Sequence, residues 1–190
     1  EQASFRFADN LRPGAKPALA TLRAQGFPMT ILSGDTESAV SAVASNLGIA
    51  EWHAKLLPSE KLEIVESRAT SGSKSLMVGD GLNDAPALRA AHASMAPATA
   101  ADIGRNAADF VFLRDSLSAI PFAFDISKRS GALIRQNFAI AVLYNFLAVP
   151  LAVFGYVTPL VAALAMSGSS ILVVANAMRL MRGTKSDDLP

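Results

Sequence analysis

Short apolar runs alternate with helical patterns over the first 120 residues of the chain. The apolar runs predict strands, because a buried parallel strand reads as a near-continuous series of apolar residues. Predicted strands cover residues 4–8, 29–33, 52–54, 75–79, 94–96 and 110–113, and predicted helices cover residues 16–25, 36–47, 59–70 and 85–91. Thr36 and Ser59 stand where helix N-caps are expected. The alternation predicts an α/β fold, with a parallel sheet and flanking helices.

The rest of the chain is mostly apolar. A helix rich in basic residues is predicted over residues 116–132, and two apolar runs, 138–156 and 160–180, follow it. Each run has roughly 20 residues, which is long enough to cross a bilayer as a helix. The basic residues that precede the first run and follow the second are Lys128, Arg129, Arg135, Arg179, Arg182 and Lys185. Both ends of this hairpin are therefore expected to face the cytoplasm, with residues 155–159 as a short outer loop. The alternative is a pair of buried helices in a soluble domain.

These patterns divide the chain into four expected parts. Residues 1–120 form the α/β part, residues 121–135 a basic linker helix, residues 136–182 two transmembrane helices, and residues 183–190 a C-terminal tail. Hydrophobic residues make up 51% of the 190 residues, and their excess lies in the C-terminal part. The net charge of +1 gives no argument for nucleic-acid binding. The chain has no cysteine, which excludes disulfides and thiolate metal sites within it.

The segment from Gly79 to Asp84 holds the densest group of candidate functional residues. It follows a predicted buried strand, and Gly79 and Gly81 allow a tight turn beside a ligand. Asp80 and Asp84 place two carboxylates at the carboxyl end of that strand, where open α/β sheets bind ligands. Such a pair indicates a hard cation, most simply Mg²⁺ beside a phosphoryl group, bound by Asp80 with Asp84 and Asn83 as further ligands or orienting groups. A surface Asp-Gly turn before a helix cap is the alternative.

Four segments carry a resemblance to a known family. They read Asp9-Asn10-Leu11-Arg12, Ser33-Gly34-Asp35, Pro58-Ser59-Glu60-Lys61 and, from Gly79 to Leu88, Gly-Asp-Gly-Leu-Asn-Asp-Ala-Pro-Ala-Leu. Together they resemble the haloacid dehalogenase superfamily in the form found in P-type ATPases, whose motifs read Asp-x-x-Arg, Thr-Gly-Asp, Pro-x-x-Lys and Gly-Asp-Gly-x-Asn-Asp-x-Pro-x-Leu. Ser33 replaces the family's Thr and keeps the hydroxyl. The resemblance implies a haloacid-dehalogenase-like Rossmannoid sheet.

The resemblance also implies a phosphoryl site. The Ser33 hydroxyl and the Gly34 backbone N–H are expected to donate hydrogen bonds to phosphoryl oxygens. Lys61 is expected to supply a compact positive charge, since a lysine in the first turn of a helix is otherwise unfavourable to the helix dipole. On spacing alone, Lys61 would be an ordinary exposed lysine. Asp35 is implied to lie close to the phosphorylation site.

The family's nucleophile motif, Asp-Lys-Thr-Gly-Thr, does not occur in the chain. The resemblance therefore implies the C-terminal part of a longer pump, without the phosphorylated Asp, the nucleotide-binding and actuator domains and the earlier membrane helices. ATP would be bound mainly by a domain outside this chain, and the chain alone is expected to be inactive. The implied partners are the N-terminal part of the pump, the lipid bilayer and, as a further candidate, a copper chaperone. The implied location is a bacterial inner membrane.

Polar residues inside the predicted hairpin point to a transported ion. Tyr144 and Asn145 lie near the middle of the first apolar run, and Met166, Ser169 and Ser170 lie at comparable depth in the second. They resemble the copper subgroup of heavy-metal P-type ATPases, and a thioether suits Cu(I). We expect these residues to face one another across the hairpin or toward neighbouring helices. The alternative is that the small residues only permit close helix packing. The family's Cys-Pro-Cys motif on an earlier helix is not in this chain.

Three other functions compete with a Cu(I) pump. The first is a pump for another metal, such as Zn²⁺ or Co²⁺, against which the absence of Asp, Glu, Lys and His from residues 138–180 argues. The second is a membrane-tethered phosphatase, which needs an Asp-x-Asp nucleophile that the chain lacks before residue 33. The third is a non-catalytic haloacid-dehalogenase-like fragment. His53 and His92 have no ligand-spaced neighbours and are expected to be ordinary surface or half-buried residues.

Overall fold

The structure is a computed structural model that describes residues 11–80, 82–113 and 116–182. It divides into two compact units, residues 1–120 and residues 121–190. The strand predicted at residues 4–8 lies outside the described residues, as do Asp9, Gly81 and Lys185. The two units are described separately below.

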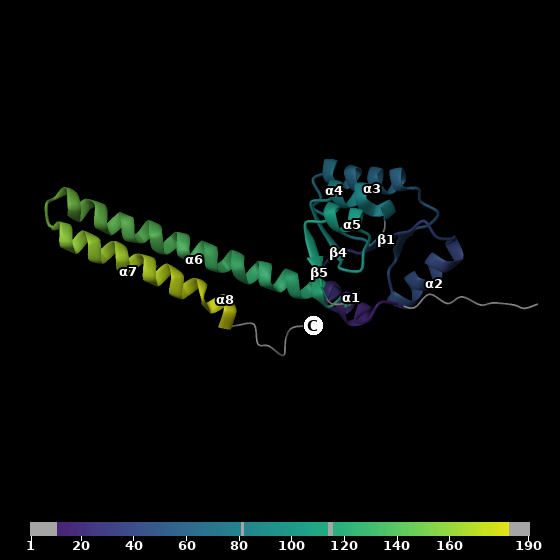
Figure 1. The fold of residues 1–190 in the computed structure, drawn as a ribbon, viewed down its shortest axis with the longest axis horizontal. Helices are drawn as coiled ribbons and strands as arrows, with labels where there is room; N and C mark the ends of the chain where they lie inside the picture. The colour runs from purple at the N-terminus through teal and green to yellow at the C-terminus, as the bar shows by residue number, and fades with distance from the viewer. Residues whose placement is uncertain (1–10, 81, 114–115, 183–190) are drawn as a thin grey trace, which may run out of the picture. The chain divides into compact units, whose positions relative to one another are not determined.

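The first unit contains two parallel sheets (Figure 1). In the smaller sheet β1 (Thr30–Leu32) pairs with β2 (Glu51–His53), and in the larger one the order is β3 (Leu76–Val78), β4 (Ala93–Pro97) and β5 (Phe110–Phe112). Ile31 lies opposite Trp52, and Met77 lies opposite Ser94. Every predicted strand within the described residues is confirmed, with bounds that differ by a residue or two.

Short helices accompany these strands in the described part of the first unit. They are α1 (Ala15–Ala24), α2 (Glu37–Leu47), α3 (Pro58–Thr70), the 3₁₀ turn η1 (Leu82–Asp84), α4 (Ala85–Ala90) and α5 (Asp102–Ala107). Their apolar faces supply most of the core, which includes Leu22, Val40, Val65, Leu88, Met95 and Phe112. The helices predicted from the sequence are confirmed, whereas α5 was not predicted. Among the six residues of α5 only Gly104 is buried, so that the helix shows no apolar face in the sequence.

The start of α3 corrects one prediction. Ser59 was expected to cap this helix, but the helix begins at Pro58 and Leu57 occupies the N-cap position. The Glu60 carboxylate accepts a hydrogen bond of 2.7 Å from the Leu57 backbone N–H, which satisfies one of the free donors at the helix start. Proline fits the first helical position because its fixed φ suits the helix and it has no N–H to leave unpaired. Thr36 occupies the N-cap position of α2, as predicted, without a side-chain cap bond.

The strands β1 and β3 are both edge strands in the described structure. Within residues 11–80, 82–113 and 116–182, β1 pairs only with β2, and β3 pairs only with β4. The predicted single sheet is therefore observed as two parallel sheets, each with an edge whose backbone groups have no strand partner in the described part of the chain. A strand edge of this kind accepts a further strand.

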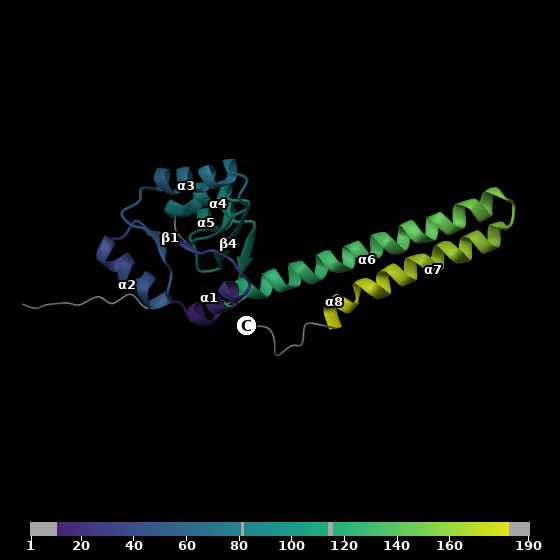
Figure 2. The same cartoon turned by 180° about the vertical axis from the view of Figure 1, so that it is seen from behind.

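The second unit is a helical hairpin. The helix α6 (Ala119–Val153) begins at the end of the first unit, a turn of five residues follows it, and α7 (Pro159–Ala177) returns, with α8 (Arg179–Arg182) after it. In both views α6 and α7 lie side by side (Figure 1 and Figure 2). Thr158 caps α7 by accepting a hydrogen bond of 3.3 Å from the Val161 N–H. The predicted linker helix and first apolar run form one continuous helix of 35 residues.

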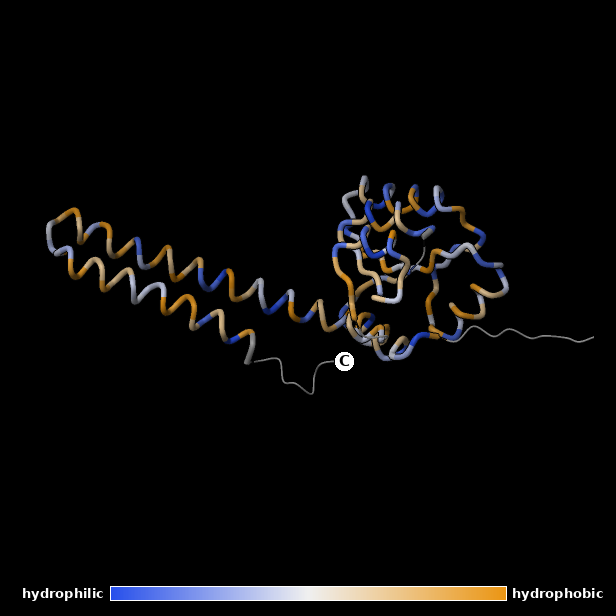
Figure 3. Tube along the Cα trace, in the orientation of Figure 1, coloured by the Kyte–Doolittle hydropathy of each residue, from blue (hydrophilic) through white to orange (hydrophobic). Residues whose placement is uncertain are grey.

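Both long helices are apolar enough to span a membrane. Their mean hydropathies over the most apolar windows are 1.5 for α6 and 1.8 for α7, and none of either window is buried inside the protein. Hydrophobic residues recur along most of α7 and along the half of α6 nearer the turn (Figure 3). The alternative of two buried helices in a soluble domain does not fit this exposure, because a core helix of a soluble protein is mostly buried.

Candidate functional site

The first part of the candidate site is the loop after β1. Ser33 continues the strand pairing, because its N–H donates to the His53 carbonyl oxygen at 3.0 Å. Its hydroxyl accepts a hydrogen bond of 3.1 Å from the Asp35 N–H and lies 3.2 Å from Asp35 Oδ2, to which it can donate. A Cβ at Gly34 would lie 3.3 Å from the Leu56 carbonyl oxygen, so a side chain there would crowd the neighbouring loop. Ser33, Gly34 and Asp35 thus form one compact turn at a strand end.

A second loop joins this turn to α3. The Leu56 N–H donates to the Ser33 carbonyl oxygen at 3.0 Å, and the Lys55 N–H donates to the Asp35 carbonyl oxygen at 2.8 Å. Lys55 has a positive φ of 56°, a conformation that non-glycine residues seldom adopt. Since α3 starts directly after this loop, the two hydrogen bonds fix the first turn of the helix, which carries Lys61, relative to Ser33.

Lys61 forms an ion pair with Asp84. The Lys61 Nζ and Asp84 Oδ1 atoms are 2.7 Å apart, and the two side chains are only 10% and 15% exposed. This pair links α3 to the turn that follows β3. An ordinary exposed lysine, which spacing alone would suggest, does not fit this burial, and the cation in the first turn of α3 has a carboxylate of the same unit as its partner. A charge-assisted hydrogen bond between two weakly hydrated groups also fixes the direction of both side chains.

Gly79 lets Asp84 approach the end of β3. The Gly79 N–H donates to the Met95 carbonyl oxygen at 3.2 Å, which continues the sheet pairing. A Cβ at Gly79 would lie 2.9 Å from both Cβ and Oδ2 of Asp84, closer than real carbon atoms approach. A glycine is required here because the Asp84 carboxylate occupies that space. Asp80, the next residue, has a side chain that is 58% exposed.

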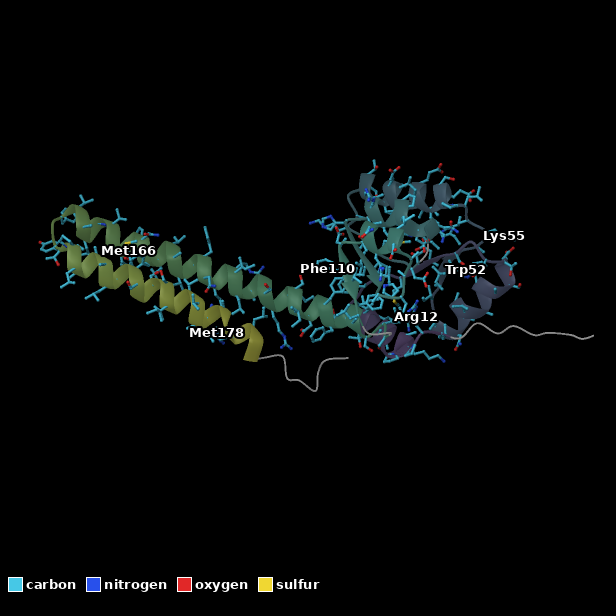
Figure 4. All side chains as sticks on the ribbon, viewed as in Figure 1. Arg12, Trp52, Lys55, Phe110, Met166 and Met178 are labelled. Atoms are coloured by element: carbon cyan, nitrogen blue, oxygen red, sulfur yellow. The ribbon has the colours of Figure 1, made fainter. Side chains whose placement is uncertain are left out.

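Arg12 is a site residue that the sequence analysis did not assign. Its guanidinium donates to Asp80 Oδ2 at 3.0 Å, and it also lies 3.4 Å from the Thr99 hydroxyl. Arg12 and Asp80 are 68 positions apart in the sequence, and only the match to the Asp-x-x-Arg motif could have pointed to Arg12. The next residues hold it in place, because the Leu117 N–H donates to the Pro13 carbonyl oxygen at 3.1 Å. Figure 4 labels Arg12 within the first unit.

The oxygen donors of Asp80, Asn83 and Asp84 fit a magnesium ion that also binds a phosphate. Mg²⁺ takes one or two protein carboxylates and completes its shell with water and phosphate oxygens. The Asp80 carboxylate is 58% exposed and pairs with Arg12, Asn83 is exposed, and Asp84 is 15% exposed and pairs with Lys61. Within residues 11–80, 82–113 and 116–182, no three His, Asp or Glu side chains form a closed metal cage. Asp80, which is much more exposed than Asp84, could therefore hold the ion, although its carboxylate also pairs with Arg12.

A second charged cluster lies at the opposite ends of β1 and β2. Thr30 donates a hydrogen bond of 2.8 Å to Glu51, and Arg68 of α3 pairs with the same carboxylate. The Thr30 hydrogen bond, with the positive charge of Arg68, lowers the pKa of Glu51 below its ordinary value. Since Thr30 and Glu51 open their strands, this cluster is remote from the candidate site and ties α3 to the sheet. His53 lies 3.7 Å from Glu51, and His92 is exposed.

The polar residues of the hairpin fall into two groups. Tyr144 and Ser169 are half-buried, whereas Asn145, Met166 and Ser170 are exposed, Met166 by 66%. The Asn145 side-chain amide donates to the carbonyl oxygen of Ala141 at 3.0 Å, and the Ser170 hydroxyl donates to that of Met166 at 3.1 Å. These bonds to the preceding turn satisfy the polar groups within their own helices. Met166 is labelled on α7 in Figure 4.

Parallel sheets flanked by helices, with acidic and hydroxyl side chains at the carboxyl ends of strands, are the arrangement of an open α/β domain with a ligand site. The family described as haloacid dehalogenase-like hydrolase matches residues 1–92. The hairpin extends the similarity beyond this domain. A solved zinc-transporting PIB-type ATPase in its E2.Pi state covers 90% of this chain, at 35% identity and a TM-score of 0.84, and the match covers 28% of that structure.

Two curated relatives narrow the class. "Nitrogen fixation protein FixI" of Rhizobium meliloti is 57% identical over 182 residues, which is 96% of this chain and 24% of the relative. "Copper-exporting P-type ATPase" of Mycobacterium leprae is 39% identical over 173 residues, which is 91% of this chain and 22% of the relative. The chain thus spans about a quarter of the length of the curated relatives it matches. It is homologous to part of the heavy-metal P-type ATPases, and with its two long apolar helices this homology supports a membrane protein.

Proposed function

We propose that this chain is the C-terminal part of an ATP-driven, Cu(I)-exporting P-type ATPase. In this proposal residues 1–120 hold most of the phosphorylation domain, residues 121–135 link it to the membrane, residues 136–182 cross the bilayer twice, and residues 183–190 form a tail. Both ends of the chain face the cytoplasm, and the membrane is a bacterial inner membrane. A copper chaperone would deliver the ion to the whole pump.

One continuous series of contacts connects the residues of the proposed phosphoryl site and supports this proposal. It runs from the Ser33 turn through the loop before α3 to Lys61, from Lys61 to Asp84, and from there to the end of β3. The ion pair between Arg12 and Asp80 adds the residue that follows β3 to this series of contacts. The series gathers a hydroxyl, an ammonium group and an exposed carboxylate at the carboxyl ends of two parallel strands, which is where α/β sheets bind phosphate.

The two strand edges indicate where the phosphorylated Asp belongs. The motif Asp-Lys-Thr-Gly-Thr does not occur in the sequence. Within the described residues β1 and β3 each lack a partner on one edge, and the candidate residues follow these same two strands. A parallel strand from the N-terminal part of the pump would pair with these edges and end in the nucleophile. Its Asp would then lie between Ser33 and Asp80.

Each side chain has a task in phosphoryl transfer. The Ser33 hydroxyl and the Gly34 N–H donate to phosphoryl oxygens, and the ammonium group of Lys61 balances the charge that builds on them. Asp84 holds Lys61 in the required direction, and Asp80 would hold Mg²⁺, which supplies charge neutralisation at the phosphate when bound. ATP would be held mainly by a domain outside this chain, so the chain alone would form no phosphoenzyme.

The donor chemistry of the hairpin supports Cu(I) as the transported ion. Met166 offers a soft thioether, and Tyr144, Asn145, Ser169 and Ser170 supply only neutral oxygen and amide groups. Two relatives that match this chain, from Mycobacterium leprae and Mycobacterium tuberculosis, are named "Copper-exporting P-type ATPase". The similar zinc-transporting structure keeps a Zn²⁺ pump as the second candidate. Against Zn²⁺, residues 138–180 contain no carboxylate or imidazole.

The phosphoryl site is tested in the full-length pump by Asp80→Asn. This change removes one negative charge at nearly constant shape, and it should abolish acid-stable phosphoenzyme while protein levels and membrane insertion are unchanged. The control is Asp102→Asn, since Asp102 is 81% exposed and, among the residues that the structure describes, pairs with Arg105 of the same helix alone. Near wild-type phosphoenzyme in Asp80→Asn would show that the site is misassigned. The chain alone, incubated with Mg·ATP, should give no aspartyl phosphate.

A further inference from the structure

Two asparagines join the helices of the hairpin. The Asn176 side-chain amide of α7 donates to Asn137 Oδ1 of α6 at 2.9 Å and lies 3.4 Å from Gln136 Oε1. The Asn176 oxygen in turn accepts a hydrogen bond of 3.2 Å from the Arg179 guanidinium. Both polar groups of the Asn176 amide are thus satisfied. Asn176 is the penultimate residue of α7, so that the cluster lies at the end of this helix away from the turn that joins α6 and α7.

The contact sets the register of the whole pair. Seven residues make almost two turns of a helix and advance it by about 10 Å. Tyr144 therefore lies on the same face of α6 as Asn137, two turns further in, and Ser169 lies likewise relative to Asn176 on α7. Because Asn137 faces Asn176 across the hairpin, Tyr144 and Ser169 come level and face each other. All four residues are half-buried, as this register requires.

The exposure of other residues agrees with the same register. Two further pairs follow from it, Ile140 with Val173 and Ala148 with Ala165, and all four side chains are half-buried. Several residues one position away point outward, since Leu143 is 60% exposed, Leu164 is 65% exposed and Leu172 is 61% exposed, whereas the small Ala141 and Gly168 are half-buried like the seam. The seam between the two helices is therefore narrow and recurs every three or four residues, as in a coiled coil.

We propose that Asn137 and Asn176 form a register lock that sets the depth of the ion-pathway residues relative to one another. With the register fixed, Asn145 lies roughly 80° round α6 from Asn137, and Met166 lies roughly 80° round α7 from Asn176. Because the helices are antiparallel, both rotations lead to the same flank of the hairpin. The lock thus brings the Asn145 amide and the Met166 sulfur to one flank, within about 3 Å of the same depth. This functional reading rests on the proposed ion pathway, whereas the register itself does not.

The composition of the seam explains why a lock is needed. Much of it consists of small residues such as Ala141, Ala148 and Ala165, which pack almost equally well after a shift of one turn. Lipid tails are as apolar as the helices, so that apolar contacts alone discriminate weakly between registers. A single buried Asn fixes register and partner choice in coiled coils, because every other alignment leaves its amide unpaired.

The register is tested by cross-linking in membranes that contain the full-length pump. The reporter pair is Ala148→Cys with Ala165→Cys, which are seam positions outside the proposed pathway, joined by a short bifunctional maleimide in metal-free buffer. A protease site in the turn between α6 and α7 shows whether the two helices stay joined after cleavage. The matched control pairs Ala148→Cys with Leu164→Cys, which lies on the outer face. We expect the reporter pair to join and the control pair not to.

The lock is tested by adding Asn176→Ala to the reporter pair. Loss of the amide should lower the cross-linking yield by about fivefold, the change expected for a hydrogen bond of about 1 kcal/mol between membrane helices. Asn137→Asp keeps an acceptor for Asn176 and should retain cross-linking, whereas Asn137→Leu should not. Gln136→Ala removes only the longer contact and should have a smaller effect.

The outcomes separate the lock from the proposed function. Unchanged cross-linking in both Asn176→Ala and Asn137→Leu would overturn the lock, and equal yields from the reporter and control pairs would overturn the register. If Asn176→Ala does not reach the membrane, the cross-linking yields of Asn137→Asp and Asn137→Leu are compared instead, and they decide whether the lock exists. None of these measurements involves copper, so that a pump for another metal would leave the expected pattern unchanged.

Discussion

The buried ion pair between Lys61 and Asp84 makes a quantitative prediction about the candidate site. Its two charged atoms are 2.7 Å apart, and the side chains are 10% and 15% exposed. At an effective dielectric constant of about 20, two unit charges at this separation attract each other by about 6 kcal/mol. Desolvation of both groups offsets much of this attraction, and removal of one partner of a buried pair typically costs about 3–5 kcal/mol.

Lys61→Met and Asp84→Asn should therefore each lower the free energy of unfolding by about 3 kcal/mol. The double variant should lose clearly less than the sum, because neither charge is then left unpaired, and the cycle should show a coupling of about 2 kcal/mol. Urea unfolding of the detergent-solubilised chain measures these values. Trp52 is the single tryptophan of the sequence and lies on β2, so that its fluorescence reports on the first unit.

The exposed pair between Asp102 and Arg105 provides the control. Asp102 is 81% exposed, so that Asp102→Asn should change the unfolding free energy by less than about 1 kcal/mol. The reasoning fails if the coupling between Lys61 and Asp84 is below about 0.5 kcal/mol, the limit at which two sites count as independent. Asp84 would then not be the group that holds Lys61 in place.

Three further predictions concern single residues of the first unit. Gly14→Ala should destabilise the first unit by about 1–3 kcal/mol more than Gly26→Ala does in thermal unfolding. Both glycines have a positive φ, of 73° and 83°, but only at Gly14 would a Cβ meet a serine hydroxyl, at 2.5 Å. Equal losses of stability in the two variants would contradict this contact. Gly79→Ala should displace Asp84 and lower phosphoenzyme of the full-length pump at least tenfold, and full activity would refute the close packing. The pKa of Glu51 is lowered in the folded state, so that its contribution to stability is present near neutral pH and is lost as the pH falls through the lowered pKa. The difference in urea midpoint between the wild type and Glu51→Gln should therefore shrink on acidification. A growing difference would contradict the assignment.

Local patterns in the sequence predicted the elements well, because burial imposes a period on each strand and helix. The two long apolar runs and the glycine-rich turn before Asp84 were visible in this way. The order of the strands could not be predicted in this way, since periodicity does not report which strand edges pair. The separation of the strands into two sheets, one with β1 and the other with β3, appears only in the structure. The basic helix was predicted to run directly into the first apolar run, but the change from basic to apolar composition led to a division into linker and membrane helix that the continuous α6 does not show.

Contacts between distant residues were beyond sequence reasoning. Lys61 and Asp84 are 23 positions apart, and each was assigned to the site separately, as a phosphate contact and as a metal group. Their mutual ion pair depends on the close approach of Asp84 to Gly79, which is a property of the folded turn. The contact between Asn137 and Asn176 likewise spans 39 positions, and an asparagine near the end of an apolar run gives no signal about its partner.

The identity of the transported ion tests the account most directly. ATP hydrolysis by the full-length pump should be measured with Cu(I), Zn²⁺ and Co²⁺, for the wild type, for Met166→Leu and for the control Met178→Leu at the end of the same helix. Leucine conserves most of the volume of methionine, so that each change should alter stability by less than about 1.5 kcal/mol. Cu(I) alone should stimulate the wild type and the control, and Met166→Leu should lose most of this stimulation. Stimulation by Zn²⁺ or Co²⁺ in place of Cu(I), or a Cu(I) response that Met166→Leu leaves unchanged, would contradict the account.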